Sequence, residues 1–502
     1  MTFEVLNSVL TLNNISWIAF GVLLGYVVGV IPGLGKGTAV AVSIPITFYL
    51  SPLTGIAYLI GIAKGSTAGS AVSAILLNTP GEPSSAPTAL DGYPLSQKGQ
   101  ASKALKMGLF ASVIGDFFAT LLLIFLAAPL AEYALLFGPV EVTSILLFSL
   151  TFIAALSGES LIKGLIAGLF GLLFSTVGME IETATVRFTF GILELFDGLS
   201  LIPVAIGMLA VAEMLVQLGG LEALEQQQKL LKGNIKSINQ NISWKEWKLS
   251  IPAIIRGTAV GSTVGILPGL GASVASFLSY GLAKKAAKDP SRFGKGAIEG
   301  IAAAESADNA VVPSSLVPLF ALGIPGSVIA AILIGAFIIQ GVTPGPLMFV
   351  QQPELVNGIY LSMICASLLL LFIGFFGQKI FSLLSLVSLR LIIPSVIFFC
   401  AIGSYLQGGG IIGVWLILFF GIFGYFAKKL DFSFVTFLIG FVVGPQFELS
   451  LRQAIAVTPS FEHLLRHPIA IIFTLIHFPL TIISLNLIDS HLLFFFIYSL
   501  AS

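Results

Sequence analysis

Charged residues are scarce in this chain, and their scarcity excludes a soluble globular fold. Only 10% of the 502 residues are Asp, Glu, Lys or Arg, whereas 56% are hydrophobic; soluble domains carry about 25% charged residues. A surface in contact with water cannot accommodate so many apolar side chains. Apolar runs of about 20 residues recur instead along the chain, and each is typical of a transmembrane helix. We therefore predict an all-α polytopic membrane protein.

The chain also has few cysteines and no net charge. The chain has two cysteines, Cys365 and Cys400, both in apolar segments, so no disulfide framework is indicated. Its 24 basic and 24 acidic residues leave a formal net charge of +0, which gives no sign of a nucleic-acid partner. No His-Glu-x-x-His motif or cysteine pairing is present. We expect no cofactor and no bound metal beyond a possible transported Na⁺.

The chain contains an internal repeat. The segment GYVVGVIPGLG (25–35) returns as GSTVGILPGLG (261–271), with seven identical positions of eleven at an offset of 236 residues. Each copy precedes a second apolar segment broken at Pro-Gly, AILLNTPGEPSS (74–85) and LFALGIPGSVIA (319–330). This duplication predicts transmembrane repeats at 1–220 and 251–450. A cytoplasmic linker at 221–250 would join them, and a transmembrane extension at 451–502 would follow.

Lysine and arginine positions predict that the two repeats insert in opposite directions. The apolar segment 251–283 has lysines before and after it, so the positive-inside rule places both its ends in the cytoplasm. Its interruption at Pro268 and Gly269 then predicts a re-entrant hairpin. The first copy, about 15–50, has no Lys or Arg in either flank and should enter from the other side. Inverted repeats with broken helices are a recurrent plan of secondary transporters, which hold substrate near the membrane midplane.

A nucleotide-binding loop is an alternative for GVIPGLGKGT (29–38), and the residue spacing excludes it. The P-loop requires Ser or Thr directly after its lysine, but Gly37 follows Lys36 and the second copy has no lysine. In a membrane, the backbone groups of a broken helix need partners from protein, water or ligand. A helix N-terminus there suits a carboxylate.

We predict that the two tips and the two later breaks bind substrate, unless each Pro-Gly only kinks a tightly packed helix. The predicted substrate-binding residues at these positions are Pro32, Gly33, Leu34, Gly35, Lys36, Asn78, Thr79, Pro80, Gly81, Pro268, Gly269, Leu270, Gly271, Gly323, Pro325 and Gly326.

Polar residues near the breaks are further candidates. Lys64, Ser66 and Thr67 would line the substrate path, unless the lysine extends to an interface and the hydroxyls bond to the backbone. Acidic residues in the second half could bind a coupling cation, Na⁺ or H⁺, unless they lie in a solvated loop. The predicted cation-coupling residues are Glu305, Ser306, Asp308 and Asn309.

The order of these motifs resembles the large membrane subunit of the tripartite tricarboxylate transporter family (TctA). The resemblance rests on GVIPGLGKGTAVAVSIPITF, AILLNTPGEPSSAPTALDGYPL, IRGTAVGSTVGILPGLGASVASFLSYGLAKK, FGKGAIEGIAAAESADNA and LFALGIPGSVIAAILIGAFIIQGVTPGPLMF, which cover most of 21–349. It implies an importer of small organic anions, di- or tricarboxylates, in a prokaryotic cytoplasmic (inner) membrane. It also implies coupling to Na⁺ or H⁺, an extracytoplasmic solute-binding protein and a small four-helix membrane subunit as partners.

Three charged residues, Lys36, Lys64 and Asp308, depart from the pattern of that family. We hypothesise that Lys64 or Lys36 pairs with Asp308, or with an anionic substrate, between the repeats. Opposite charges about 4 Å apart attract by about 4 kcal/mol at an effective dielectric constant of 20. Such a pair would offset much of the free-energy cost of burying the charges.

Two other functions compete with anion import. One is a carrier or channel for another solute. The other belongs to a different class, an intramembrane enzyme, and it would require a convergent nucleophile and base or a metal set. The sequence offers no such set, so we expect no enzymatic activity.

The inverted topology can be tested with single cysteines in a variant that lacks Cys365 and Cys400. We expect a cysteine at position 240 to react with a membrane-impermeant maleimide only from the cytoplasmic side, because lysine-rich loops stay inside. Cysteines flanking the first hairpin should react only from the opposite side. Labelling of both hairpins from one face of the membrane would contradict the inversion.

Overall fold

The computed structural model describes residues 3–31, 33–156, 160–180, 183–219, 241–384, 389–407, 409–458 and 467–473. Among these residues the only sheet is a hairpin of β1 (Gly178–Met179) and β2 (Val186–Arg187). Eight of the described helices are long and apolar enough to cross a membrane. The predicted all-α class is confirmed, and the chain is a multi-pass membrane protein.

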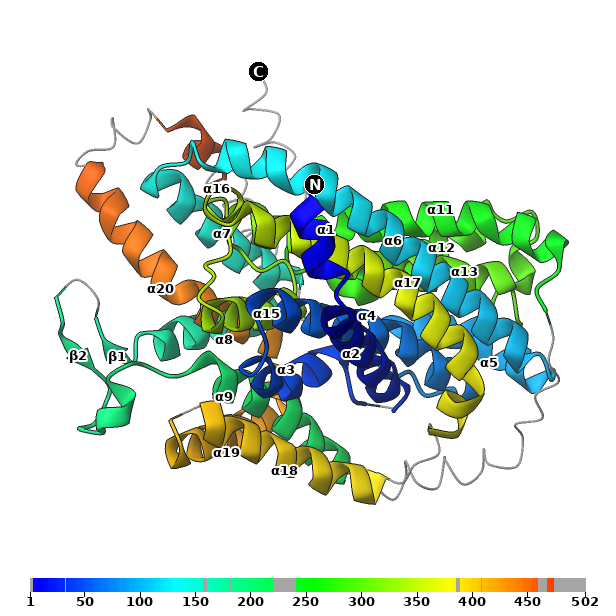
Figure 1. The fold of residues 1–502 in the computed structure, drawn as a ribbon, viewed down its shortest axis with the longest axis horizontal. Helices are drawn as coiled ribbons and strands as arrows, with labels where there is room; N and C mark the ends of the chain where they lie inside the picture. The colour runs from blue at the N-terminus through cyan, green and yellow to red at the C-terminus, as the bar shows by residue number, and fades with distance from the viewer. Residues whose placement is uncertain are drawn as a thin grey trace. The chain divides into compact units, whose positions relative to one another are not determined.

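The chain divides into two compact units, and the larger comprises Met1–Ala131 and Ile202–Tyr425. This unit contains both copies of the repeated motif. Its helices, labelled as in Figure 1, are α1 (Phe3–Val9), α2 (Leu12–Val30), α3 (Lys36–Thr47), α4 (Pro52–Leu77), η1 (Pro83–Ser85), α5 (Ala86–Gln97), α6 (Ala101–Ala134), α9 (Leu201–Ile206), η3 (Gly207–Val211), α11 (Trp244–Ile266), α12 (Gly271–Ala286), η4 (Pro290–Arg292), α13 (Ile298–Ser314), α14 (Leu316–Leu322), α15 (Val328–Ile339), α16 (Met348–Gln351), α17 (Pro353–Leu384), α18 (Leu389–Gln407) and α19 (Ile411–Lys429).

The smaller unit comprises Glu132–Leu201 and Phe426–Ser502. Its elements are α7 (Pro139–Leu156), α8 (Leu161–Ser175), the β1–β2 hairpin, η2 (Leu193–Leu195) and α20 (Phe434–Val457). Helix α20 packs against α7 and α8, and Arg187 Nη1 lies 2.8 Å from Glu448 Oε1, joining the hairpin to α20. Each predicted repeat contributes residues to both units, so the boundaries of the units differ from the boundaries of the repeats. Residues 221–240 of the predicted linker, and most of 451–502, lie outside the described residues.

Both predicted Pro-Gly tips interrupt helices. Helix α2 ends at Val30 before α3, and α11 ends at Ile266 before α12. Gly33 and Gly269 have φ angles of 81° and 90°, in the left-handed region that favours glycine. Helices α2 and α11 have 19 and 23 residues, so each is longer than the half-helix expected in a re-entrant hairpin.

The second break of each half also falls where the sequence predicts it. Helix α4 ends at Leu77, and Asn78 follows in the left-handed conformation with φ 52°. Helix α14 ends at Leu322, and Gly323 follows with φ 73°. The two residues are 245 positions apart in the sequence, so the same turn closes the corresponding helix in each half.

Glycines pack α2 onto α4 in the first half and α11 onto α13 in the second. A Cβ at Gly25 in α2 would lie 2.2 Å from the carbonyl oxygen of Ile62 in α4, and a Cβ at Gly261 in α11 would lie 2.3 Å from that of Ala307 in α13. The glycines are 236 residues apart and their partners 245. The two halves therefore share one packing plan, as a duplication requires. Their opposite insertion stays a prediction.

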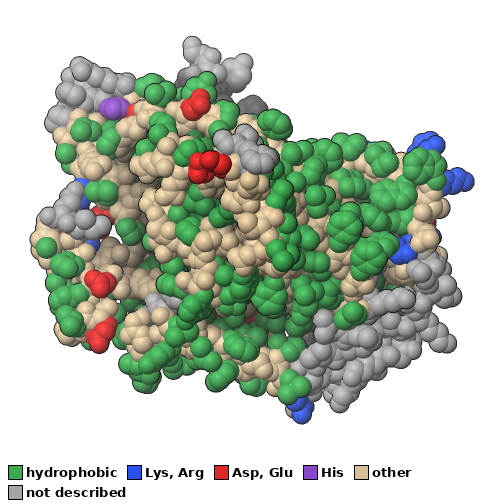
Figure 2. All heavy atoms as spheres, viewed as in Figure 1, with side chains coloured by type: hydrophobic (Ala, Val, Ile, Leu, Met, Phe, Trp, Pro, Cys, Tyr) green, Lys and Arg blue, Asp and Glu red, His purple; other side chains and the backbone are tan. Residues whose placement is uncertain are grey.

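Apolar side chains also cover the outside of the helices (Figure 2). Phe125 on α6 and Phe376 on α17, for example, are 72% and 75% exposed. Helix α4, by contrast, is buried at every position from Thr54 to Leu77. Outward-facing phenylalanines suit contact with lipid, and α4 lies within the protein.

The glycine packing predicts which glycines resist substitution. Gly25→Ala and Gly261→Ala should each lower the melting temperature, because the new Cβ meets a backbone carbonyl that cannot move aside; overpacking costs about 1–3 kcal/mol. Gly281→Ala in α12 is the matched control, since no described atom outside its own helix lies within 4 Å of the added Cβ. Thermal unfolding of the purified protein in detergent measures all three. Equal melting temperatures for the three variants would contradict the packing.

Candidate functional site

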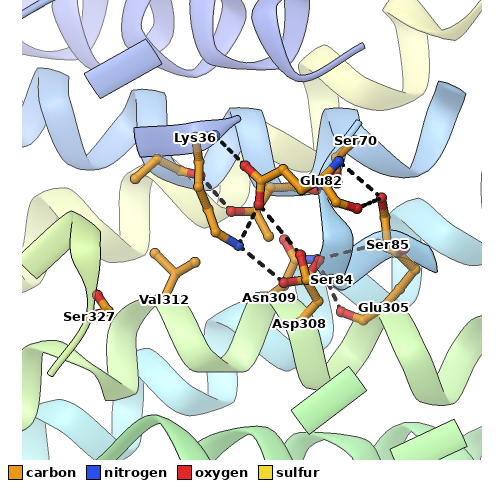
Figure 3. A network of polar contacts seen from close by, with 12 residues as sticks. Lys36, Ser70, Glu82, Ser84, Ser85, Glu305, Asp308, Asn309, Val312 and Ser327 are labelled. Carbon is orange, nitrogen blue, oxygen red and sulfur yellow. Dashed lines mark hydrogen bonds and ion pairs between the residues drawn. The ribbon is translucent and has the colours of Figure 1, made fainter. Parts of the chain in front are cut away.

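Lys36 lies at the centre of a charged cluster. It is the first residue of α3, and its ammonium lies 2.9 Å from Glu82 Oε2 and 3.2 Å from Asp308 Oδ1 (Figure 3). Glu82 directly follows the first half's Pro80-Gly81 break, and Asp308 is in α13 of the second half. We call Lys36, Glu82 and Asp308 the charged cluster.

The Glu82 carboxylate also binds the N-terminus of α3. The backbone N–H of Lys36 donates a hydrogen bond to Glu82 Oε1. Gly35, the N-cap residue, has no side chain to accept from the first turn of this helix. The N-terminal N–H groups of a helix lack partners within the helix and attract negative charge. Glu82 supplies that charge from a different segment of the chain.

Neighbouring serines hold Glu82 in place. The Ser84 hydroxyl lies 3.4 Å from Glu82 Oε2, and the Ser85 hydroxyl donates to the Glu82 carbonyl oxygen at 2.9 Å. The backbone N–H of Glu82 donates back to Ser85 Oγ at 3.4 Å. These bonds form the short η1 turn that begins at Pro83, so the turn itself orients the carboxylate toward Lys36.

Asp308 is fully buried, and its two oxygens differ. Oδ1 faces the Lys36 ammonium, whereas Oδ2 has no hydrogen-bond partner among the described residues. An unpartnered buried oxygen of a carboxylate is costly. With both acids ionised, the charged cluster has one positive and two negative charges.

A second polar group lies one turn earlier on α13. Glu305 Oε1 accepts from Thr88 Oγ1 at 2.6 Å, and Glu305 Oε2 accepts from Ser112 Oγ at 3.0 Å. Asn309 Nδ2 donates to Ser112 Oγ at 2.9 Å and to the Glu305 carbonyl oxygen at 3.0 Å. We call Glu305, Asn309, Thr88 and Ser112 the Glu305 group. It brings α5 and α6 of the first half onto α13 of the second.

Asp91 of α5 anchors the start of α13. Its Oδ1 accepts hydrogen bonds of 2.8 Å from the backbone N–H groups of Gly294, Gly296 and Ala297, and its Oδ2 accepts from Tyr280 Oη at 2.9 Å. A fully buried carboxylate that accepts four hydrogen bonds holds these segments together. It thereby positions the helix that carries Glu305 and Asp308.

Lys64 has a different set of partners. Its ammonium lies 2.8 Å from Asp116 Oδ2 in α6 and 2.9 Å from Ser367 Oγ in α17. It also donates to Thr120 Oγ1 and to the Met363 carbonyl oxygen, both at 3.0 Å. Of the two lysines in the pairing hypothesis, Lys36 pairs with Asp308 and Lys64 pairs with Asp116. Lys64 is buried at the junction of α4, α6 and α17.

The hydroxyls of three other predicted residues make no hydrogen bond to the charged cluster among the described residues. Thr67 Oγ1 donates to the Ala63 carbonyl oxygen at 2.8 Å, as a helical threonine commonly does. Ser306 Oγ donates to the Ala303 carbonyl oxygen at 3.2 Å and faces Gly257 of α11. Ser66 is buried, and its hydroxyl has no hydrogen-bond partner within the described ranges.

The first tip and the first break flank the charged cluster. A Cβ at Gly33 would meet the Gln217 side chain, and a Cβ at Gly35 would lie 3.7 Å from Glu82 Oε1. Leu34 is buried in an apolar contact with Met214 and Ile393. Among the other predicted residues, Pro32 lies outside the described part of the chain. The turn after α4 contains Asn78, Thr79, Pro80 and Gly81, directly before Glu82.

A backbone hydrogen bond joins the second tip to the second break. The N–H of Gly269 donates to the carbonyl oxygen of Gly326 at 3.3 Å. Leu270 packs against Ala275 and Ala307, and Gly271 begins α12. The offset of 245 residues aligns Glu82 with Ser327. Ser327 Oγ lies 2.9 Å from Ser315 Oγ, whereas Glu82 contacts a lysine. The charged cluster therefore has no equivalent at the second tip and break.

Sequence reasoning did not identify Glu82, Thr88 or Ser112 as site residues. Glu82 carried a usable signal, because an acidic residue directly after a Pro-Gly break in an apolar region needs a partner. Thr88 and Ser112 carried none, since buried hydroxyls are common in membrane helices and usually bond to their own backbone.

The sequence matches the family described as "Tripartite tricarboxylate transporter TctA family" over residues 15–439. The chain belongs to this family. The TctA match spans both tips, both breaks and all members of the charged cluster and the Glu305 group. It confirms the family resemblance seen in the motifs and makes this chain a membrane subunit of a tripartite tricarboxylate transporter.

Two proteins of Agrobacterium vitis are similar to this TctA chain. One is an uncharacterized 52.8 kDa protein in the TAR-I ttuC′ 3′ region, 39% identical over 449 residues, which cover 89% of this chain and 88% of that protein. The other is an uncharacterized protein in the TAR-II ttuC′ 3′ region, 39% identical over 198 residues, or 39% of this chain and 82% of that protein.

The Lys64–Asp116 pair predicts a strong difference between single and double replacement. Lys64→Met should destabilise the protein by about 3–5 kcal/mol, because Asp116 is left buried without its counter-charge. The double variant Lys64→Met/Asp116→Leu should recover most of that loss, since an apolar pair can replace a buried ion pair. Thermal unfolding in detergent measures both. A single variant as stable as the wild type would show that the pair contributes nothing.

Proposed function

We propose that this TctA chain imports small organic anions, di- or tricarboxylates, by alternating access coupled to a Na⁺ or H⁺ gradient. It would work in a prokaryotic cytoplasmic membrane with an extracytoplasmic solute-binding protein and a small four-helix membrane subunit. The tips at Gly33–Lys36 and Gly269–Gly271 and the breaks at Gly81 and Gly326 would form the substrate site.

The carboxylate of Glu82 on the N-terminus of α3 is the observation that carries this proposal. It is held by a backbone N–H and by the Lys36 ammonium. A substrate carboxylate meets the same two kinds of donor at this tip, because a helix N-terminus and a lysine both favour an anion. Since Glu82 now occupies these donors, substrate binding requires it to move or to share them.

The charges of the site supply a reason for cation coupling. Lys36 provides one positive charge, whereas Glu82, Asp308 and Glu305 can provide three negative ones. An incoming anion is repelled unless positive charge enters with it. Protonation of a carboxylate or binding of Na⁺ would provide this charge. The Glu305 group and Asp308, with Ser306 nearby, are the proposed cation-coupling residues.

Helix interruptions at a boundary between halves suit alternating access. Secondary transporters built from inverted repeats bind their substrate at such a boundary, where discontinuous helices meet. Here Lys36 and Glu82 come from the first half and Asp308 from the second. A movement of one half against the other would change the distances within the charged cluster, and so the affinity for anion and cation together.

Transport by reconstituted vesicles tests the proposal. Purified protein is placed in proteoliposomes, with and without the small subunit and the binding protein, and uptake of labelled citrate, succinate or malate is measured under an imposed Na⁺ or proton gradient. We expect gradient-driven uptake of at least one of these anions. Uptake that ignores both gradients would contradict coupling, and ion conductance without anion uptake would favour a channel.

Lys36→Met should lower the initial uptake rate at least tenfold, because a charged hydrogen bond contributes about 1.5–3 kcal/mol. Lys285→Met is the matched control, since Lys285 is an exposed residue of α12. Its uptake should equal that of the wild type. If both variants transport at the wild-type rate, Lys36 has no part in substrate binding.

A further inference from the structure

The Lys36 ammonium lies where a free cation would lie if one bridged the two carboxylates. Its nitrogen contacts one oxygen of Glu82 and one of Asp308. The exposed fractions of these two acidic side chains are 7% and 0%. Buried carboxylates need hydrogen-bond donors or a positive partner, because water cannot stabilise their charge, and for this pair Lys36 is the positive partner.

The oxygen atoms around this position suit a hard cation such as Na⁺. Two carboxylates face it, and the Ser84 hydroxyl lies next to Glu82. The unpartnered Oδ2 of Asp308 adds a buried oxygen that nothing in the described ranges satisfies. Oxygen ligands select hard cations rather than transition metals. The described residues include no group of three or more His, Cys, Asp or Glu side chains that could hold a metal ion.

Lys36, Glu82 and Asp308 form a charged cluster at one pair of tip and break but not at the equivalent pair. The sequence offsets align Lys36 with Ala272, Glu82 with Ser327 and Asp308 with Ala63 in the opposite half. No charged residue stands at any of these three aligned positions. The lysine is therefore present where the pair of acids is present, as expected of a counter-ion for that pair.

We propose that the Lys36 side chain is a tethered counter-ion that occupies the place of Na⁺ between Glu82 and Asp308. Its covalent attachment keeps the ammonium near the carboxylates whatever the Na⁺ concentration. The consequence for transport rests on the proposed function: Na⁺ does not bind between Glu82 and Asp308 when an anion is imported. Proton uptake by the carboxylates is then the route by which this site couples import to a gradient.

Removal of the tether tests the proposal without any substrate. The melting temperature of purified protein is measured in NaCl and in choline chloride at equal ionic strength. The wild type should show no difference between the two salts that Asp308→Asn removes. Lys36→Met should melt at least about 3 °C higher in NaCl, because a cation that binds only the folded state stabilises it by mass action.

Three variants control for other causes. Lys36→Arg keeps the positive charge and should respond to Na⁺ no more than the wild type does. The double variant Lys36→Met/Asp308→Asn loses one of the two acids and should lose the response of the single variant. Lys285→Met, at an exposed position, should behave as the wild type.

Two results would overturn the proposal. The first is a Na⁺ response of the wild type that Asp308→Asn removes, since Na⁺ would then bind at this pair with the lysine present. The second is an equal response, or equal absence of one, in Lys36→Met and its double variant. Lys36→Gln serves the same comparison if the methionine variant does not fold. These measurements use no carboxylate substrate, so the tethered counter-ion can be disproved while gradient-driven uptake is observed, and the reverse.

Discussion

The contact between Glu82 and the first residue of α3 satisfies a constraint on which the rest of the structure depends. A helix interrupted within a membrane leaves backbone N–H and carbonyl groups that lipid cannot bind. In this chain, each tip donates a backbone hydrogen bond to a residue at the break of the same half. Glu82, at the first break, accepts from Lys36 at the first tip, and Gly326, at the second break, accepts from Gly269 at the second tip. Each tip is thus stabilised by the break of its own half.

Close packing of glycine rows brings these interruptions to the interior. Because Gly25 and Gly261 lack side chains, α2 and α11 approach the backbones of α4 and α13 directly. The approach buries α4 and α13, which carry Lys64, Glu305 and Asp308. Charges on such helices must be paired within the protein. Two polar groups result: Lys64 pairs with Asp116, and Lys36 pairs with Glu82 and Asp308.

Much of the fold was predictable from the sequence, and only part of the site. Long apolar runs, the repeated motif and the Pro-Gly interruptions are local patterns, and they predicted the all-α class, the family and the places where helices break. The pairing of Lys36 with Asp308 was one of several alternatives, because these residues are 272 positions apart. Lys64 had the same alternatives until the structure paired it with Asp116. Glu82 was missed although its place after a Pro-Gly break carried a signal, because that signal does not identify the partner.

The sequence by itself determined that this chain is a helical membrane protein, that it contains a duplication, and that its helices break at four Pro-Gly positions. These properties depend on the hydrophobicity and backbone preferences of neighbouring residues, which act over a few turns of chain. The tertiary structure alone decided which acid neutralises which lysine. That choice depends on distances between helices far apart in the sequence, and electrostatic attraction within a buried interior is strong only between groups brought within a few ångströms.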